Sequence, residues 1–334
     1  MSATYLVTGG AGFIGSHIVH TLVSRGQQVR VLDDFSTGQR ANLEPVINDI
    51  ELVEADVRDR AVVEEAARGV DYVLHQAALP SVAESVADPL TANEVNVRGT
   101  LNVLVAARDA GVKQLVLASS CAIYGNDPQL PKRETMLPTP SSPYAATKLA
   151  GESYCAVFSQ VYGLPTVCLR YFNAAGADPE GELGEDHHPE RHLIPLALRA
   201  ARGGPPLQVF GADYPTPDGT CLRDYVHVAD LARAHLQALA GLEAGRASTV
   251  YNLGNGRPHS VREVISSVER VTGRAVPHAL APRRAGDPAV LFASSARIKG
   301  DLGWAPRYED LDTIVRTAWA WMEAHPGGYG EARP

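Results

Sequence analysis

The stretch TYLVTGGAGFIG, Thr4 to Gly15, decides the fold. Its apolar start, Tyr5 to Thr8, predicts a buried strand, and Phe13 begins a segment with the pattern of a helix. The turn between them holds three glycines, Gly9, Gly12 and Gly15. Glycines let the backbone turn tightly and approach a pyrophosphate, whose charge is attracted by the amino end of the helix. Such turns also occur without a ligand, so the glycines alone do not establish a nucleotide site.

An acidic pair, Asp33 and Asp34, follows the second predicted strand, Gln28 to Leu32. A carboxylate at this place can accept hydrogen bonds from the hydroxyls of an adenosine ribose. It would also repel a 2′-phosphate, so Asp33 favours NAD over NADP. Asp56, after the third strand, has two interpretations: a contact to the adenine edge or an ordinary helix cap.

Strands and amphipathic helices alternate through the first half of the chain. Further strands are predicted at Glu51–Val53, Tyr72–His75, Leu115–Ala118, Thr166–Tyr171 and Val250–Leu253. This alternation predicts an α/β fold, a Rossmann-type doubly wound parallel sheet with helices on both faces.

After Asn173 the composition changes, and the sequence becomes rich in glycine, proline and charged residues. We therefore predict a second, smaller and discontinuous α/β domain that binds the substrate. The dinucleotide-binding domain would comprise residues 1–173 plus about 224–255, and the substrate domain residues 174–223 plus about 256–334. Within this division, Arg223 to Ala240 has a helix-forming pattern.

Composition narrows the partners. The 334 residues carry 38 acidic and 30 basic side chains, a formal charge of −8, with no sustained basic stripe. Nucleic acid and anionic membrane surfaces are therefore not expected partners. The four scattered cysteines predict reduced thiols, the start of the chain has no signal-peptide pattern, and no apolar run is long enough for a bilayer. We expect a cytoplasmic protein.

Tyr144 and Lys148 form a Tyr-xxx-Lys pair on one face of a predicted helix. Tyrosine ionises near pH 10, and lowering its pKa by ~3 units takes roughly 4 kcal/mol. The Lys148 ammonium, with a positively charged nicotinamide ring, would supply that stabilisation. Chance matches to this spacing are frequent. Here, however, Pro143 comes directly before the pair, and a serine-rich strand end lies some twenty residues earlier. A hydroxyl, a base and a cation are therefore expected at one site.

Several motifs together resemble the extended short-chain dehydrogenase/reductase family: the glycine spacing, HQAA at His75–Ala78, NVRGT at Asn96–Thr100 and the Tyr-xxx-Lys helix. The stretches YFNAAGADPEGELGED, FGADYPTPDGTCLRDYVHVADLA and YNLGNG are similar, more narrowly, to the UDP-glucose 4-epimerase (UDP-galactose 4-epimerase) family. The resemblance runs from about residue 4 to about residue 320. It implies an NAD-dependent isomerase of UDP-glucose and UDP-galactose in carbohydrate (galactose) metabolism. A homodimer would form through helices near Asn96–Ala110 and Ala145–Ser159.

The resemblance implies a set of NAD-binding residues. They are Gly9, Gly12, Phe13, Ile14, Gly15, Asp33, Asp56, Val57, Gln76, Ala77, Ala78, Asn96, Tyr144 and Lys148. Lys148 would also hold the nicotinamide ribose.

The resemblance also selects the catalytic residues, Ser120, Tyr144 and Lys148. Tyr144 would take the proton of the sugar 4-hydroxyl while the C4 hydride moves to NAD. The 4-keto sugar would then rotate about its link to the diphosphate, and the hydride would return to the opposite face of C4. Related 4,6-dehydratases carry Asp-Glu after the catalytic hydroxyl, where this chain has Cys121-Ala122, so loss of water is disfavoured. Cys121 is expected to be a small half-buried thiol and Ser119 a supporting residue.

The substrate-binding residues implied by the resemblance are Ser120, Asn173, His192, Leu193, Arg223, Arg284, Asp287 and Leu291. For the two arginines the alternative is surface ion pairing with Asp224 or Asp287. Leu291 matches a position facing the sugar 2-substituent, where a large aromatic excludes an N-acetyl group and a small residue admits it.

Other functions stay open at this point. They are 4-epimerisation or decarboxylation of a UDP-N-acetylhexosamine, UDP-uronate or UDP-pentose, and a catalytically silent nucleotide sensor. The histidines of the segment Asp186–His192 fit no closed tetrahedral metal site by spacing, so we expect a solvated loop and no metal.

Overall fold

The computed structural model describes residues 3–284 and 287–330. Its centre is a seven-stranded sheet with every neighbouring pair parallel, in the order β10-β6-β5-β4-β1-β2-β3. The strands are β1 (Thr4–Thr8), β2 (Gln28–Asp33), β3 (Ile50–Glu54), β4 (Tyr72–His75), β5 (Gln114–Ser120), β6 (Thr166–Tyr171) and β10 (Thr249–Leu253). The strand order reverses between β1 and β4, and ligands of doubly wound sheets bind at the carboxyl ends beside such a reversal. The predicted parallel α/β sheet is confirmed.

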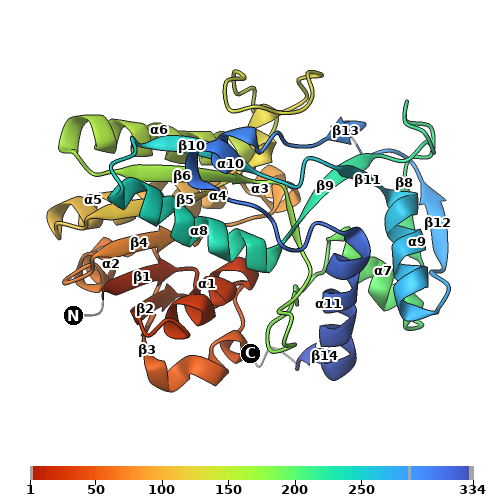
Figure 1. Cartoon of the computed structure of the whole chain (residues 1–334), viewed down its shortest axis with the longest axis horizontal. Helices are drawn as coiled ribbons and strands as arrows, with labels where there is room; N and C mark the ends of the chain where they lie inside the picture. The colour runs from red at the N-terminus through yellow and green to blue at the C-terminus, as the bar shows by residue number, and fades with distance from the viewer. Residues whose placement is uncertain (1–2, 285–286, 331–334) are drawn as a thin grey trace.

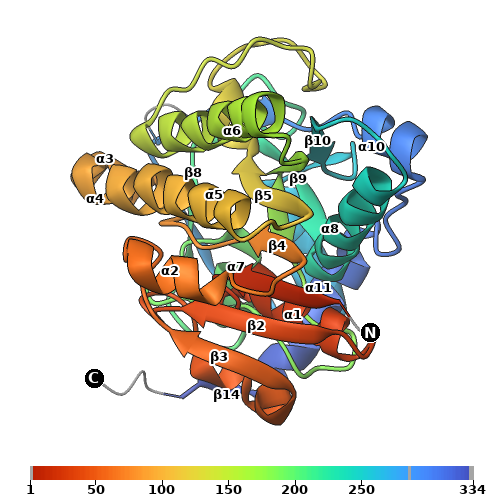
Figure 2. The same cartoon turned by 90° about the vertical axis from the view of Figure 1, so that its left-hand side faces the viewer.

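Helices cover both faces of this sheet (Figures 1 and 2). One face carries α1 (Phe13–Val23) and α8 (Val228–Glu243), and the other carries α2 (Arg60–Ala66), α5 (Gly99–Asp109) and α6 (Pro143–Tyr162). Each layer has its own apolar core, one around Ile18 and Leu231 and the other around Val63 and Leu104, all fully buried. The sheet is therefore buried on both faces, as its unbroken apolar strands require.

A second group of elements follows the sheet in the chain and lies beside it in Figure 1. A four-stranded sheet joins β7 (Asn173–Ala175), β9 (Leu222–His227), β11 (Pro258–Ser260) and β13 (Val290–Leu291). A separate pair joins β8 (Leu207–Phe210) to β12 (His278–Ala281). Three helices, α7 (Leu193–Ala201), α9 (Val261–Thr272) and α11 (Leu311–Ala324), share a third core around Val264 and Ile314.

Shorter elements connect these parts. They are η1 (Arg40–Asn42), η2 (Glu44–Asp49), α3 (Val82–Ala87), α4 (Pro89–Asn93), a π-helical turn η3 (Glu94–Arg98), η4 (Cys121–Tyr124), α10 (Ala296–Leu302) and β14 (Pro326–Tyr329). All four cysteines are free thiols. Within residues 3–284 and 287–330, no helix has both the length and the apolar character that a bilayer crossing needs.

The segment Arg223–Ala240, predicted as helical throughout, is a strand followed by a helix. Tyr225 and Val226 belong to β9, and α8 begins only at Val228. The strand runs straight into the helix without a glycine or proline, so the sequence offers no boundary. We assigned residues 224–227 to the first domain, but they pair with strands of the second sheet. We assigned α10 to the second domain, but it packs on β10 and α8 of the first. The two-domain division stays a prediction.

Candidate active site

One large cavity, of about 880 Å³, opens at the carboxyl ends of the central strands and extends to the second group of elements. Its size suits a nucleotide or sugar nucleotide. The cavity is lined by these predicted site residues: Gly9, Gly12, Phe13, Ile14, Gly15, Asp33, Asp56, Val57, Gln76, Ala77, Ala78, Ser120, Tyr144, Lys148, Asn173, His192, Arg223, Asp287 and Leu291. The fold thus brings segments that are far apart in the sequence to one site.

The glycine turn between β1 and α1 leaves no room for side chains. A Cβ atom on Gly15 would lie 2.0 Å from the carbonyl oxygen of Gly9, and one on Gly9 would lie 2.5 Å from the amide nitrogen of Ala77. Gly9 also has a φ of +67°, which favours glycine. Gly12 begins α1 without a side-chain cap, so the first helix amides are free for an anion. This turn fits the pyrophosphate of a dinucleotide.

Asp33 fixes the end of β2 against this turn. Its carboxylate accepts hydrogen bonds from the amides of Ala11 at 2.8 Å and Phe35 at 2.9 Å. Burial raises the pKa of Asp33, while the two amide bonds act in the opposite direction. Each carboxylate oxygen keeps a second lone pair for a ribose hydroxyl, and the side chain lines the cavity.

Asp56 is not a helix cap. The cap of α2 is Asp59, whose carboxylate accepts from the amides of Ala61 and Val62. Asp56 instead pairs with Arg58, through a 2.8 Å bond from Nε, and this partner lowers its pKa. Because Asp56 also lines the cavity, the interpretation as an adenine contact stays a prediction.

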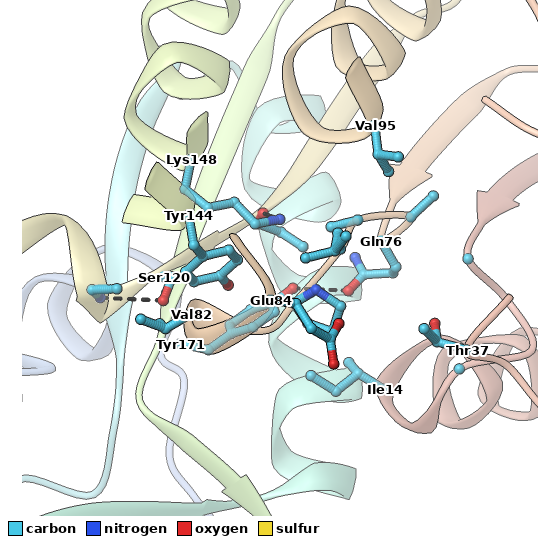
Figure 3. A pocket seen from close by; sticks show the side chains of 18 of the residues that line it. Ile14, Thr37, Gln76, Val82, Glu84, Val95, Ser120, Tyr144, Lys148 and Tyr171 are labelled. Carbon is cyan, nitrogen blue, oxygen red and sulfur yellow. Dashed lines mark hydrogen bonds between the residues drawn. The ribbon is translucent and has the colours of Figure 1, made fainter. Parts of the chain in front are cut away.

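Figure 3 shows Ser120, Tyr144 and Lys148 gathered at one side of the cavity. Ser120 ends β5, and its Oγ accepts a hydrogen bond from the amide of Ala122 at 3.2 Å. Tyr144 and Lys148 come from the first turns of α6, one helical turn apart. The Lys148 Nζ donates to the carbonyl oxygen of Ala118 at 3.0 Å and lies 5.9 Å from the centre of the Tyr144 ring.

Burial dominates the electrostatics of this pair. It raises the pKa of Tyr144 to about 12, although the Ser120 hydroxyl lowers it, and it lowers the pKa of Lys148 to about 8. For the chain by itself, desolvation of the phenol outweighs the hydrogen bond from Ser120. The predicted lowering of the Tyr144 pKa by Lys148 together with a bound nicotinamide stays a prediction. The positive charge of an oxidised nicotinamide would add to the stabilisation of a tyrosinate.

Ser119 faces away from the cavity centre into a buried polar network. Its Oγ donates to Glu152 at 2.5 Å, and Glu152 forms an ion pair with Arg170 at 2.7 Å. Arg170 in turn donates to the hydroxyl of Tyr124 at 2.8 Å. The supporting role predicted for Ser119 is confirmed: the network anchors β5 beneath Ser120.

Cys121 lines the cavity as a half-buried thiol, as predicted. Burial raises the pKa of its thiol to about 12. The sulfur is therefore protonated at neutral pH and is a poor nucleophile or base.

The second group of elements supplies the far wall. Arg223 on β9 has its Nη2 3.5 Å from Asp287, and Leu291 of β13 lies opposite it in the strand register. Asp224 is not a partner of this arginine: its carboxylate accepts from three backbone amides, those of Asn255, Gly256 and Ala293. Nη1 of Arg223 donates to the carbonyl oxygen of Leu222 at 2.9 Å, and the side chain lines the cavity.

Three predicted residues do not line the cavity. Asn96 is buried behind it, where its side chain holds the backbone of Leu79 and the hydroxyl of Thr147. Leu193 packs on the third core at the start of α7. The guanidinium of Arg284 lies over the ring of Phe210, 3.9 Å from its centre. Asn96 therefore supports the cofactor wall through Leu79, and a substrate role of Arg284 stays a prediction.

The cavity also contains residues that our sequence analysis did not select, among them Thr37, Glu84, Tyr171 and His187. Tyr171 ends the predicted strand β6, so its place at the carboxyl edge could have singled it out. Its hydroxyl donates to Gln76 at 3.1 Å (Figure 3). Thr37 and His187 lie in connections without a periodic signal, and Glu84 lies in the short helix α3.

The histidine-containing segment is partly solvated, as expected for its histidines. The side chains of His188 and His192 are 60% and 61% exposed, and that of His187 is 29% exposed. The side chains of Glu185 and Glu190, by contrast, are only 4% and 1% exposed, which the sequence did not predict.

The fold and the site together define a dinucleotide-dependent enzyme with a serine, tyrosine and lysine at the reacting end. Comparison with known proteins agrees: the NAD dependent epimerase/dehydratase family matches residues 5–254, and this chain belongs to that family. The UDP-glucose 4-epimerase of Lacticaseibacillus casei is 44% identical over 98% of this chain and 99% of its own.

Solved structures give the same result. The UDP-glucose 4-epimerase from Brucella ovis, in complex with NAD, is 45% identical with a TM-score of 0.91, covering 99% of this chain and 100% of that one. The UDP-glucose 4-epimerase from Bifidobacterium longum, in complex with NAD+ and UDP, is 35% identical with a TM-score of 0.90, covering 98% and 100%.

Proposed function

We propose that this chain interconverts UDP-glucose and UDP-galactose by NAD-dependent epimerisation at C4. The observation that carries the proposal is one cavity whose lining includes the glycine turn, Asp33, Tyr144 and Arg223. Relatives of nearly the same length are UDP-glucose 4-epimerases, which supports the same assignment.

The chain's own residues then have distinct roles. Bound NAD supplies the oxidation and re-reduction of the sugar C4. Tyr144 takes the proton of the 4-hydroxyl and gives it back, and Ser120 donates a hydrogen bond to the same oxygen. Lys148, tied to the carbonyl of Ala118, holds the nicotinamide ribose. Arg223 and Asn173 hold the nucleotide diphosphate while the 4-keto sugar rotates to present its opposite face.

The site favours epimerisation over dehydration. Elimination of water needs an acid and a base beside the catalytic hydroxyl, and here Cys121 and Ala122 occupy those positions. Cys121, with its raised pKa, does not replace them. The 4-keto sugar can therefore only be reduced again at C4.

The direct test is to incubate the purified chain with UDP-glucose, without added nucleotide, and to measure UDP-galactose. We expect conversion to equilibrium together with NAD released on denaturation. Absence of both product and bound NAD would overturn the proposal.

Substrate breadth depends on Leu291, which lies in the cavity opposite Arg223. Leucine leaves less room than a small residue, so we expect a preference for UDP-glucose over UDP-N-acetylglucosamine. One or two methylene-sized contacts change kcat/KM by about 10–200-fold. Leu291→Ser should bring the kcat/KM for UDP-N-acetylglucosamine closer to that for UDP-glucose when both are measured side by side. An unchanged ratio of the two values would show that Leu291 does not determine this preference.

We also propose a cytoplasmic homodimer that forms through α5 and α6, which pack side by side on one face of the sheet. Val157 and Val161, one turn apart on α6, are 48% and 64% exposed and would be covered by the partner. The double substitution Val157→Asp, Val161→Asp should convert a dimer to a monomer in analytical ultracentrifugation. A parent that sediments as a monomer would refute this assembly.

A further inference from the structure

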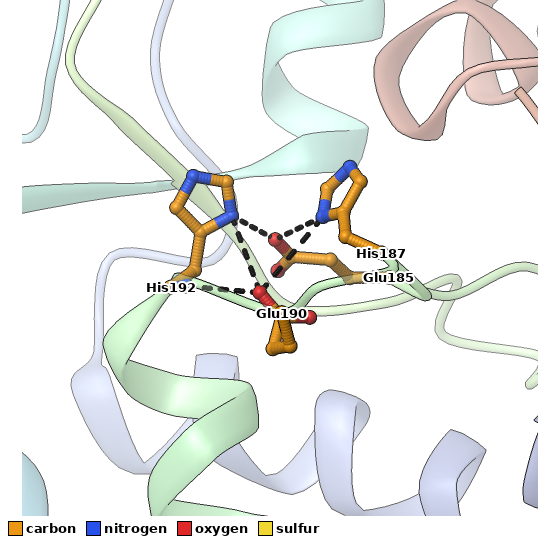
Figure 4. Close-up of side chains that lie close together, drawn as sticks. All are labelled: Glu185, His187, Glu190 and His192. Carbon is orange, nitrogen blue, oxygen red and sulfur yellow. Dashed lines mark hydrogen bonds and ion pairs between the residues drawn. The ribbon is translucent and has the colours of Figure 1, made fainter. Parts of the chain in front are cut away.

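Four side chains converge at the start of α7, apart from the catalytic residues. Glu185, His187, Glu190 and His192, here called the Glu-His cluster, each offer a ligand atom, and all these atoms lie within 4.8 Å of one another. Figure 4 shows the two imidazoles facing Glu185 from opposite sides, with Glu190 below. All four come from an eight-residue stretch, so one folded segment presents them together.

The distances in the cluster are close to those of a metal shell. The Nδ1 atom of His187 lies 3.2 Å from Glu185 Oε1 and 3.9 Å from Glu190 Oε1. The Nδ1 atom of His192 lies 3.8 Å from Glu190 Oε1 and also contacts Glu185 Oε1. Ligands at about 2.0–2.2 Å from a tetrahedral zinc ion are separated by roughly 3.3–3.6 Å. Because the four ligand atoms lie within 4.8 Å of one another, side-chain movements of roughly 1 Å would bring all four to one ion.

The cluster contains two buried carboxylates, those of Glu185 and Glu190. They raise the pKa of His187 and that of His192, the latter to about 9, so without a cation the protonated imidazoles balance the charge. The nearby arginines are engaged elsewhere: Arg191 pairs with Glu84 at 2.9 Å and Arg199 with Asp186 at 3.5 Å. A divalent cation would neutralise the pair.

Two atoms of the cluster also have unmet hydrogen-bonding capacity. In the described part of the chain, Oε2 of Glu190 is buried without a hydrogen-bond partner, and Nδ1 of His187 is buried with an ion-pair contact to Glu185 but no contact of hydrogen-bond geometry. The Nδ1 atom of His187 points into the cluster in Figure 4. Buried polar atoms of this kind are rarely left unpaired, and a cation at the centre would satisfy His187 directly.

The backbone holds the cluster in place. The amides of Arg191 and His192 donate to Glu190 Oε1 at 2.7 and 2.8 Å, and His192 is the residue that begins α7. Hydrogen bonds that hold a ligand side chain from outside the metal shell orient it toward the metal.

We propose that the Glu-His cluster binds a zinc ion. Two imidazoles favour zinc over magnesium or calcium, which prefer oxygen ligands alone. Four protein ligands close the shell, which is typical of a structural site. The ion would fix residues 185–192 to α7, and because His187 and His192 line the cavity, it would shape the wall on the substrate side.

The test is a titration of the full chain, freed of metal by chelator and dialysis, with Zn²⁺ in the presence of excess Mg²⁺. We expect one Zn²⁺ per chain by calorimetry, a higher melting temperature with Zn²⁺, and the visible absorption of a tetrahedral site when Co²⁺ replaces it. Failure of the unmodified chain to bind one equivalent overturns the proposal, whatever its epimerase activity.

Variants locate the ion. The double substitution His187→Ala, His192→Ala should lower the affinity at least about tenfold and remove the Co²⁺ spectrum. His188→Ala is the matched control, because the side chain of His188 is exposed and outside the cluster. Equal zinc binding by the double variant and by His188→Ala would place the ion elsewhere and refute the site.

Discussion

Ser119 and Ser120 are neighbours at the end of β5 and have different roles, because successive strand residues point to opposite faces. Ser119 joins the buried network of Glu152 and Arg170, and Ser120 faces Tyr144 in the cavity. Composition could not separate the two serines, whereas the resemblance selected Ser120. The burial of the Tyr144 phenol, which raises its pKa in the chain by itself, depends on packing and was not visible in the sequence.

Replacing Tyr144 by phenylalanine removes only the phenol oxygen. A positioned acid-base group contributes about 10²–10⁴-fold, so kcat for UDP-galactose should fall by that range. The aromatic ring stays, so bound NAD and the melting temperature should match the parent. We would measure turnover by chromatography of the two sugar nucleotides. A variant as active as the parent would exclude Tyr144 as the acid-base residue.

Arg223→Ala should weaken substrate binding more than chemistry. The guanidinium lines the cavity and keeps donors for a diphosphate, and a lost charge-assisted bond costs about 1.5–3 kcal/mol. We expect KM to rise about 10-fold or more with a smaller change in kcat. Arg283→Ala is the control, since Arg283 pairs with Asp213 and does not line the cavity. Equal KM values for the two variants would contradict this role.

At the scale of elements, the central sheet was predictable and the second group was not. Each strand of the sheet begins and ends within three residues of its prediction, and every strand except the edge strand β3 contains a run of buried residues. By contrast, β7, β11 and β13 are two or three residues long, and β9 gains its partners from positions far along the chain. Such short strands are determined by long-range pairing, which leaves no local period. Thr37 and His187 were missed because they lie in connections without a local period. Asn96, Leu193 and Arg284 do not line the cavity, and their binding roles stay predictions.

The junction of β1 and α1 gives a prediction at this scale. A methyl group on Gly15 would meet the Gly9 carbonyl at 2.0 Å, so the backbone must move. Gly15→Ala should therefore cost about 1–3 kcal/mol of stability and lose bound NAD. Gly300→Ala in α10 is the control, because nothing lies within 4 Å of its added Cβ. Thermal unfolding and the absorbance of released nucleotide measure both effects; retention of NAD by Gly15→Ala would contradict the account of the turn.

At the scale of the whole molecule, four buried histidines link stability to pH. Burial lowers the pKa of His17 and His235 to about 4 and that of His75 and His227 to about 3, from an ordinary value of 6.5. The unfolded chain therefore takes up protons first as the pH falls. The stability is fully present above about pH 6.5 and is lost as the pH falls toward the folded values, by about 2 kcal/mol per histidine at pH 5.

We expect the free energy of unfolding, from urea titrations, to fall steeply between pH 7 and pH 5. His75→Gln should make this slope shallower, because His75 is held between the hydroxyls of Thr8 and Thr100 and glutamine can bond both without titrating. The exposed His188→Gln should leave the slope unchanged. Identical slopes for all three proteins would show that His75 does not titrate as described.

The central claim is that oxidation and re-reduction at C4 take place within one closed site around Tyr144. The most direct measurement uses UDP-glucose deuterated at C4 with the purified chain and no added nucleotide. The account predicts UDP-galactose that keeps the deuterium at C4, formed more slowly than from unlabelled substrate. Product whose C4 deuterium has been replaced by solvent hydrogen would contradict it.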